Sequence, residues 1–164
     1  MPDAGGRPYL IRPDEGGAIW SLGGHFRTLA RDADTDGHFS LVEAIAFRAT
    51  EPPLHIHHRE AEAWYILDGQ MTFRVGDETF VATAGSFAYA PKGIPHAFTV
   101  DVEPTRVLVL AAPAGFEAFA AELGIPALGT QPPDDLAVPL PEVLGPIAER
   151  YGIEVVGPPL RDSH

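Results

Sequence analysis

Three histidines and a glutamate near the middle of the chain have the side chains and spacing of a metal site: His55, His57, Glu62 and His96. Residues two apart in a β-strand point to the same face, so a strand here presents His55 and His57 together. Imidazole and carboxylate ligands suit Mn, Fe, Co, Ni, Cu or Zn without selecting among them. The chain has no cysteine, which excludes a thiolate site. Taken alone, a His-rich run is also compatible with a solvated loop.

These residues belong to a longer pattern of fixed offsets. Its first part is His55-x-His57-x4-Glu62-x6-Gly69, and its second part is Gly85-x5-Pro91-x-Gly93-x2-His96. At these positions the chain resembles the cupin superfamily, whose two motifs have the same residue types at the same spacing. Two positions depart from the family pattern, because Ala49 stands where a glycine is expected and Val100 where an asparagine is common. Neither is a ligand position, so the expected ligand set is complete.

The resemblance implies a fold, a cofactor and an assembly. The implied fold is all-β, a cupin-type antiparallel β-barrel or jelly roll with the metal inside its mouth. The implied cofactor is one divalent transition metal per chain (Ni, Mn, Fe, Co, Cu or Zn), with ligands His55, His57, Glu62 and His96. Many cupins are dimers, so we expect a homodimer.

Within the superfamily, the chain is most similar to the quercetinase-like single-cupin dioxygenases. The run Glu-x-x-Tyr-Ile-Leu-Asp-Gly begins at Glu62, and the run Ala-Pro-Ala-Gly-Phe-Glu-x-Phe begins at Ala112. This similarity implies a dioxygenase that inserts O2 into a metal-bound flavonol or a comparable enolate, with Glu62 as a ligand and the catalytic base. Two other functions stay open, because one fold hosts many reactions. They are a redox-neutral enzyme, such as a polyketide cyclase or an isomerase, and a non-catalytic module that binds a small molecule.

Apolar residues close to the ligands in sequence predict a substrate pocket. If Glu62 and His96 face the metal, strand alternation turns the residues two positions further along the same way. The candidate pocket residues are Trp64, Ile66, Phe73, Tyr89 and Phe98. An apolar pocket with few polar groups is typical of a small-molecule site, although core packing is an equally ordinary role for such side chains.

The elements that must position these residues are short strands. Up to residue 112, segments rich in Val, Ile, Phe, Tyr, Trp and Thr alternate with Gly, Pro and Asp, which is typical of an all-β fold. Gly and Pro contribute 17 residues each, which favours many turns. The expected strands are 18–21, 26–29, 39–47, 62–67, 71–75, 78–82, 87–89, 96–100 and 105–110. Asp32, Asp34 and Asp36 lack the full calcium-loop pattern and predict a polar hairpin loop.

The last third of the chain has a different pattern. Phe116, Phe119, Ala120 and Leu123 recur at helical spacing, and Gly124 follows as a stop signal. A second helix is expected over 141–151, after a proline-rich connector. We therefore expect a single domain over residues 1–164. It has a barrel core at about 9–112 and a helical, Pro-rich extension at 113–164. The similarity to quercetinase-like enzymes implies that the helix around Phe116 and Phe119 covers the barrel mouth, and a role of the extension in dimerisation stays open.

Charge and composition limit the partners. The chain has 23 acidic and 11 basic residues and a net charge of −12, which repels nucleic acid backbones and anionic membrane surfaces. Its first residues lack the pattern of a secretory signal, and no apolar run is long enough to span a bilayer. We expect a cytoplasmic protein that acts on a small-molecule substrate, with O2 as a second substrate of a dioxygenase. We expect no nucleic-acid or membrane partner.

Overall fold

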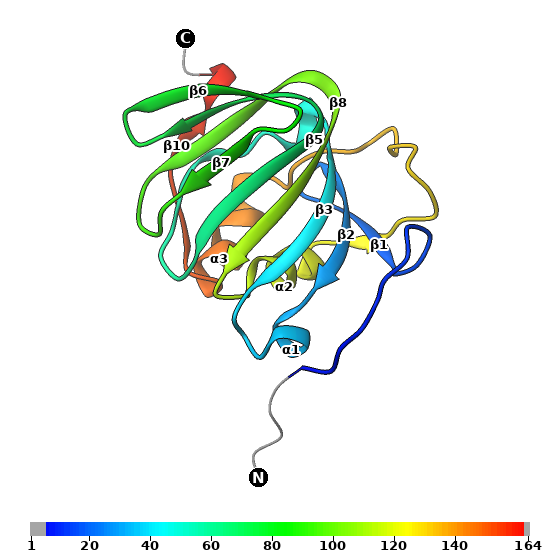
Figure 1. Ribbon diagram of the computed structural model, residues 1–164. Coiled ribbons are helices and arrows are strands. Elements are labelled where there is room, and N and C mark those ends of the chain that lie inside the picture. The colour runs from blue at the N-terminus through cyan, green and yellow to red at the C-terminus, as the bar shows by residue number, and fades with distance from the viewer. Residues whose placement is uncertain (1–5, 163–164) are drawn as a thin grey trace.

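The computed structural model describes residues 6–162 and consists mainly of antiparallel strands (Figure 1). The strands are β1 (Ala18–Ser21), β2 (Gly24–Ala30), β3 (Ser40–Ala46), β4 (Pro53–His57), β5 (Ala61–Val75), β6 (Glu78–Thr83), β7 (Phe87–Ala90), β8 (His96–Ala112), β9 (Ile125–Pro126) and β10 (Ile153–Pro159). The helices are α1 (Asp32–Thr35), α2 (Phe116–Glu122) and α3 (Pro141–Arg150), with single 3-10 turns η1 (Arg48–Thr50) and η2 (Leu160–Asp162). The predicted all-β class is confirmed. Residues 1–5, part of the segment judged to lack a signal pattern, lie outside the described residues.

Two long strands organise the sheet. β5 and β8 pair antiparallel along most of their length, from Ala61 opposite Ala112 to Val75 opposite His96. The carboxyl half of β8 also pairs with β3, and β2, β1 and β9 follow in that order. Its amino end pairs with β4, which is followed by β10. On its other edge β5 pairs with β7 and β6, so the two long strands connect all the others.

The irregular middle of β5 requires a glycine. The pairing of β5 with β8 shifts register repeatedly between Ile66 and Met71, which is the signature of β-bulges. Gly69 lies within this stretch with φ +97°, and a Cβ there would lie 2.2 Å from Oγ1 of the buried Thr105. A side chain would be strained by the backbone and would clash with β8. The motif position at residue 69 must therefore be glycine, because it lies in the bulged stretch that separates the two halves of β5.

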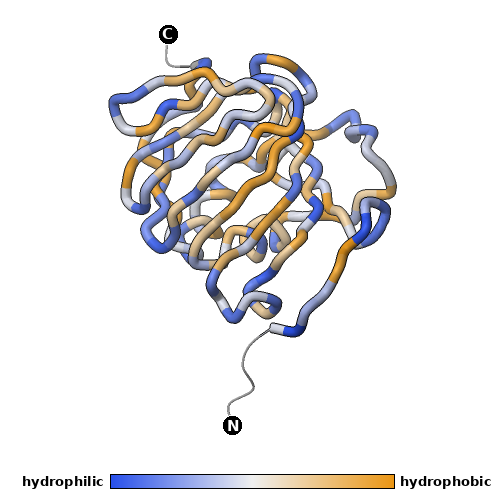
Figure 2. Tube along the Cα trace, in the orientation of Figure 1, coloured by the Kyte–Doolittle hydropathy of each residue, from blue (hydrophilic) through white to orange (hydrophobic). Residues whose placement is uncertain are grey.

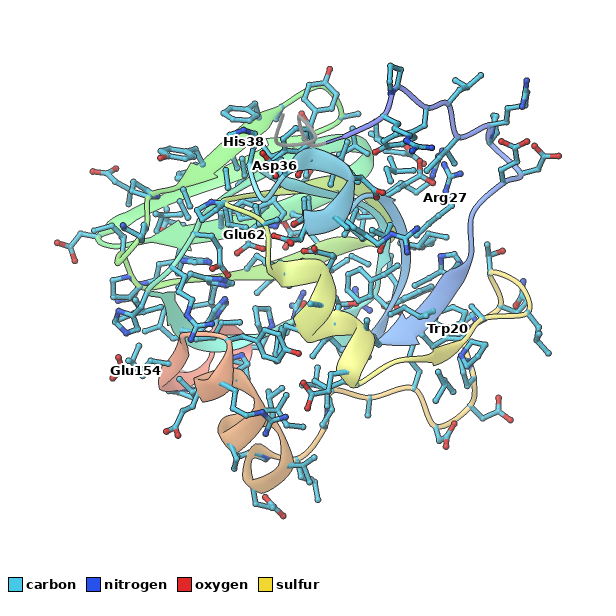
Figure 3. The ribbon with its side chains drawn as sticks, turned by 90° about the horizontal axis from the view of Figure 1, so that it is seen from below. Trp20, Arg27, Asp36, His38, Glu62 and Glu154 are labelled. Carbon is cyan, nitrogen blue, oxygen red and sulfur yellow. The ribbon has the colours of Figure 1, made fainter. Side chains whose placement is uncertain are left out.

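The core consists of two apolar clusters. The larger lies between the strands and includes Phe26, Trp64, Met71 and Phe73, and Figure 2 shows hydrophobic residues gathered along the central strands. The smaller joins α2, α3 and β10 through Phe119, Leu144, Ala148 and Ile153. Leu22 and Phe116 pack against both clusters. In Figure 3, which views the molecule from below, α2 and α3 lie across one end of the strands.

The expected elements recur with some changes. The strands expected at 62–67 and 71–75 merge into β5, and those at 96–100 and 105–110 merge into β8, because the bulged segments between them stay paired. The two expected helices are α2 and α3. The hairpin loop predicted around Asp34 connects the antiparallel strands β2 and β3, and within it Asp32–Thr35 forms the single-turn helix α1. β10 was not expected, and it pairs with β4 from within the segment assigned to the extension.

Within residues 6–162, no helix combines the length and apolarity that crossing a membrane requires.

Candidate metal centre and adjoining cavity

Strands β4, β5 and β8 bring the four predicted ligands together. His55 and His57 lie on β4, Glu62 near the start of β5 and His96 at the start of β8. His55 stands directly opposite His96 in the pairing of β4 with β8. One ligand atom from each of the four residues lies within 4.8 Å of the others. Local alternation thus aligns the two β4 histidines, and strand pairing adds the other two ligands.

Each histidine of this cluster has an acceptor at Nδ1. The three Nδ1 atoms lie 2.7 Å from the Pro53 carbonyl oxygen for His55, 2.6 Å from Glu60 Oε1 for His57, and 3.0 Å from the Ile94 carbonyl oxygen for His96. An acceptor at Nδ1 holds the ring proton there and leaves the Nε2 lone pair for a metal. Three such imidazoles and one carboxylate fit a divalent transition metal.

Glu62 is the acidic member of the cluster. Its Oε2 lies 3.2 Å from Nε2 of His57 and 3.0 Å from Nε2 of His96, and the residue is 5% exposed. Burial would raise the pKa of Glu62, but the neighbouring imidazoles, His57 first, outweigh it and lower the pKa to about 2. Glu62 is therefore a carboxylate at neutral pH, the form that can bind a metal.

The two β4 histidines have opposite pKa shifts. Burial, followed by the nearby imidazoles of His96 and His57, lowers the pKa of His55 to about 3. For His57, burial also acts to lower the pKa, but the carboxylates of Glu62 and Glu60 together raise it. His55 is therefore neutral at pH 7, as a ligand must be, whereas His57 is held against two carboxylates.

The cluster faces an apolar cavity. The cavity has a volume of about 820 Å³, including its open mouth, and His55, His57 and Glu62 form part of its wall. Its remaining lining comes mostly from the inner faces of the strands and from α2, α3 and β10. In Figure 3, Glu62 lies inside the molecule between the sheet and α2, while Glu154 lies at the outer edge. Three of the four candidate ligands are therefore open to a small molecule that enters this part of the cavity.

Comparison with known proteins agrees with the fold and the cluster. A family model described as a cupin domain matches residues 42–111, which include all four candidate ligands. Residues 42–111 of the chain are a cupin domain. Quercetin 2,3-dioxygenase of Bacillus subtilis (strain 168) is 29% identical to this chain over 126 residues. That alignment covers 77% of this chain and 37% of the relative, so the chain spans little more than a third of the relative's length.

Solved structures give the same fold. KdgF from Halomonas sp. matches with a TM-score of 0.58 at 16% identity, over 68% of this chain and 98% of that one. Pac13, a nucleoside dehydratase from Streptomyces, matches with a TM-score of 0.54 at 16% identity, over 74% of this chain and 92% of that one. Identities at this level establish the shared fold and nothing about the reaction.

The predicted pocket residues of this cupin separate into three groups. Trp64 and Phe98 line the cavity. Ile66 and Phe73 are at most 1% exposed, and both pack in the larger core cluster and do not line the cavity. Tyr89 is 50% exposed and the prediction for it is wrong, because its neighbours in β7, Ala88 and Ala90, face inward.

Sequence reasoning missed several residues that shape the site. Glu60 received no role, although it is 3% exposed and contacts His57. Its only sequence signal is its place three residues after a motif histidine. Leu144 and Ala148 of α3 line the cavity, and the helical spacing of the expected second helix was their signal. Ile153 of β10 also lines it, within a segment where no strand was expected.

Proposed function

We propose that this cupin is a metal-dependent dioxygenase of small molecules that carry an acidic enol-type hydroxyl. The observation that carries the proposal is the convergence of His55, His57, Glu62 and His96 beside an apolar cavity. The similarity to quercetin 2,3-dioxygenase supports oxygen chemistry over other cupin reactions. A homodimer and a cytoplasmic location stay predictions; light scattering of the purified protein would test the first.

The four residues would hold one divalent transition metal. Their donor atoms are three imidazole nitrogens and one carboxylate oxygen, and the acceptors at Nδ1 orient the rings for binding through Nε2. A bound metal would supply Lewis acidity and an open coordination position for an oxygen donor.

Glu62 would act as the base toward the substrate. Both of its histidine contacts go to Oε2, which leaves Oε1 as the atom that can accept a proton. Glu62 lines the cavity, so a hydroxyl placed there lies within reach of this oxygen. The proton moves from the substrate hydroxyl to Oε1, and the substrate becomes an electron-rich anion.

The cavity wall would protect this anion from water. Its apolar side chains exclude solvent, which strengthens electrostatic interactions inside and limits reprotonation. An electron-rich carbon of the anion can then react with O2, with both oxygen atoms incorporated into the cleaved product. The two substrates would therefore be an enol-type molecule and O2.

The decisive measurement is oxygen uptake by the metal-reconstituted full chain. The protein is loaded in turn with Mn, Fe, Co, Ni, Cu and Zn and supplied with flavonols, catechols and β-diketones. We expect uptake with at least one combination, incorporation of both atoms of isotopically labelled O2, and loss of turnover in Glu62→Gln. The matched control is Glu154→Gln, which changes an exposed glutamate that also contacts a histidine, His58.

Two other outcomes would overturn the oxygenase assignment. Turnover that proceeds equally well without oxygen would indicate a redox-neutral cupin, such as a cyclase or an isomerase. Saturable substrate binding with no turnover under any metal would indicate a non-catalytic binding protein.

A further inference from the structure

The charged and imidazole side chains that line the cavity all belong to the candidate metal cluster. Apart from His55, His57 and Glu62, its lining side chains are apolar with the exception of Thr50. The inner faces of β2, β3 and β8 contribute Phe26, Ala44, Ala46, Val107 and Val109. The helical side contributes Phe116, Phe119, Leu144 and Ala148. Most of a bound molecule would therefore contact hydrocarbon and aromatic surface.

The hydroxyl of Thr50 has no proton left to donate to a ligand. Thr50 Oγ1 accepts a hydrogen bond from the Phe47 backbone N–H at 2.9 Å and donates one to the Gly23 carbonyl oxygen at 2.9 Å. Its hydroxyl proton is thus engaged within the protein. Pro52 and Pro53 also line the cavity, and proline has no N–H to donate.

The tryptophan in the wall lies beside the candidate metal cluster. The ring of Trp64 packs edge-on against His96, with 5.5 Å between ring centroids. The ring of Trp64 therefore lies next to a candidate ligand. No Lys or Arg lines the cavity formed by the described residues, so a second anionic group such as a phosphate would find no cation there.

We infer that the substrate carries its oxygen donors at one end only, on the part that reaches His55, His57 and Glu62, and is an unsubstituted aryl or alkyl body elsewhere. This inference rests on the proposed function and narrows its substrate class. A hydroxyl on the distal body would lose its water, and the one polar side chain of that part of the wall, Thr50, has no proton to donate to it. That loss weakens binding by roughly tenfold or more for each such hydroxyl.

The test compares ligands that differ only in distal hydroxyls. The Mn-loaded full chain is titrated under nitrogen with 3-hydroxyflavone and with quercetin, which has the same head and further hydroxyls on its outer rings. The chain has two tryptophans, and Trp20 does not line the cavity. In the Trp20→Phe variant, quenching of fluorescence therefore reports on Trp64. We expect 3-hydroxyflavone to bind at least about tenfold more tightly than quercetin. Equal or tighter binding of quercetin would overturn the inference.

Flavone, which lacks the 3-hydroxyl, separates this inference from the proposed function. If flavone binds as tightly as 3-hydroxyflavone, the metal-centre residues do not bind the 3-hydroxyl group. The proposed function is then wrong, whatever the effect of distal hydroxyls. If 3-hydroxyflavone binds more tightly than flavone but no better than quercetin, the substrate class alone is wrong.

A pair of variants locates the effect in the cavity wall. Val109 lines the cavity on β8, whereas Val81 on β6 is 59% exposed. In Val109→Thr a hydroxyl would lose its water when an apolar ligand enters, so we expect 3-hydroxyflavone to bind roughly threefold to tenfold more weakly. Val81→Thr should bind it as the wild type does. Unchanged binding by a folded Val109→Thr protein would contradict an apolar contact at this wall.

Discussion

The Nδ1 atom of His57 lies 2.6 Å from Oε1 of Glu60, and both side chains are 3% exposed. Glu60 is not in the candidate ligand set, yet its carboxylate is buried against one of the ligands. A carboxylate at this position fixes the ring of a metal-binding histidine and makes its other nitrogen a stronger ligand. Glu60 is therefore a positioning residue for the candidate metal centre.

Glu60→Gln should weaken metal binding by about 10- to 100-fold. The amide keeps the size of the side chain but removes the negative charge that supports His57. Competition with a chromophoric chelator would measure the dissociation constant of the metal. Glu154 lies 2.7 Å from His58 in an exposed pair, so Glu154→Gln is the matched control and should change nothing. If the two variants bind the metal with equal affinity, Glu60 does not support the metal centre.

Replacement of a candidate ligand should abolish metal binding. His57→Ala and His96→Ala each remove one of the few donors in a four-ligand set, so bound metal should fall from about one ion per chain to near zero. Elemental analysis of the purified variants would measure it. His58→Ala is the control, because His58 is exposed and contacts Glu154. Full metal content in a folded His57→Ala protein would disprove the assignment.

The candidate ligands could be predicted from sequence because two of them are adjacent by local alternation and the other two stand at fixed offsets in the motifs. His55 and His57 share a face of β4 by alternation alone, and Gly69 is required by its positive φ and its closeness to Thr105. The orientation of Tyr89 could not be predicted in this way. β7 is only four residues long, and its alternating alanines and aromatics fit either face until the pairing with β5 is known.

Non-local contacts account for the rest of what was missed. β10 pairs Ile153 with His57 and Val155 with His55, although nearly a hundred residues separate them in the chain. Its sequence, Ile-Glu-Val-Val-Gly-Pro-Pro, ends in residues that usually indicate a turn. The cavity wall has the same origin, since α2, α3 and β10 reach it only through tertiary packing.

Gly69→Ala should destabilise the fold by at least about 2 kcal/mol. The new Cβ would lie 2.2 Å from Thr105 Oγ1, and the backbone at φ +97° disfavours any side chain. Urea unfolding would give the free energy. Gly129 is the contrasting position, because a Cβ there would meet nothing within 4 Å and its φ lies outside the left-handed region. Gly129→Ala should change the free energy of unfolding by less than about 1 kcal/mol, and equal effects of the two variants would refute this explanation.

Acid should destabilise the metal-free protein between about pH 6.5 and pH 3. The pKa of His55 is lowered from 6.5 to about 3, so in this range the unfolded chain binds a proton that the folded chain does not. Glu62, lowered from 4.5 to about 2, adds to the loss below about pH 4.5. The pKa of His57 is raised, so its contribution is complete below pH 6.5 and is lost only at higher pH.

The expected slope is about 1.4 kcal/mol per pH unit for each group that titrates in this way. Urea unfolding of chelator-treated protein at several pH values would measure it. His55→Asn should remove the contribution of about one proton from this slope above pH 4.5. An unchanged slope in His55→Asn would show that His55 is not held neutral by the fold.

Filling the cavity should block substrate binding without loss of metal. Ala148 on α3 is 1% exposed and lines the cavity, so the larger side chain of Ala148→Leu would occupy space that a ligand needs. We expect the dissociation constant for 3-hydroxyflavone to rise at least about tenfold, while metal content stays the same because the four ligands are untouched. Ala118→Leu, on the exposed face of α2, should bind as the wild type does.

Added volume in a packed site costs about 1–3 kcal/mol, so thermal unfolding of Ala148→Leu is measured first. Val138→Phe provides a second filling variant, because Val138 lines the cavity from the connector before α3. Wild-type affinity in either folded variant would place the binding site elsewhere, since a ligand in this cavity cannot share the volume that the new side chain takes.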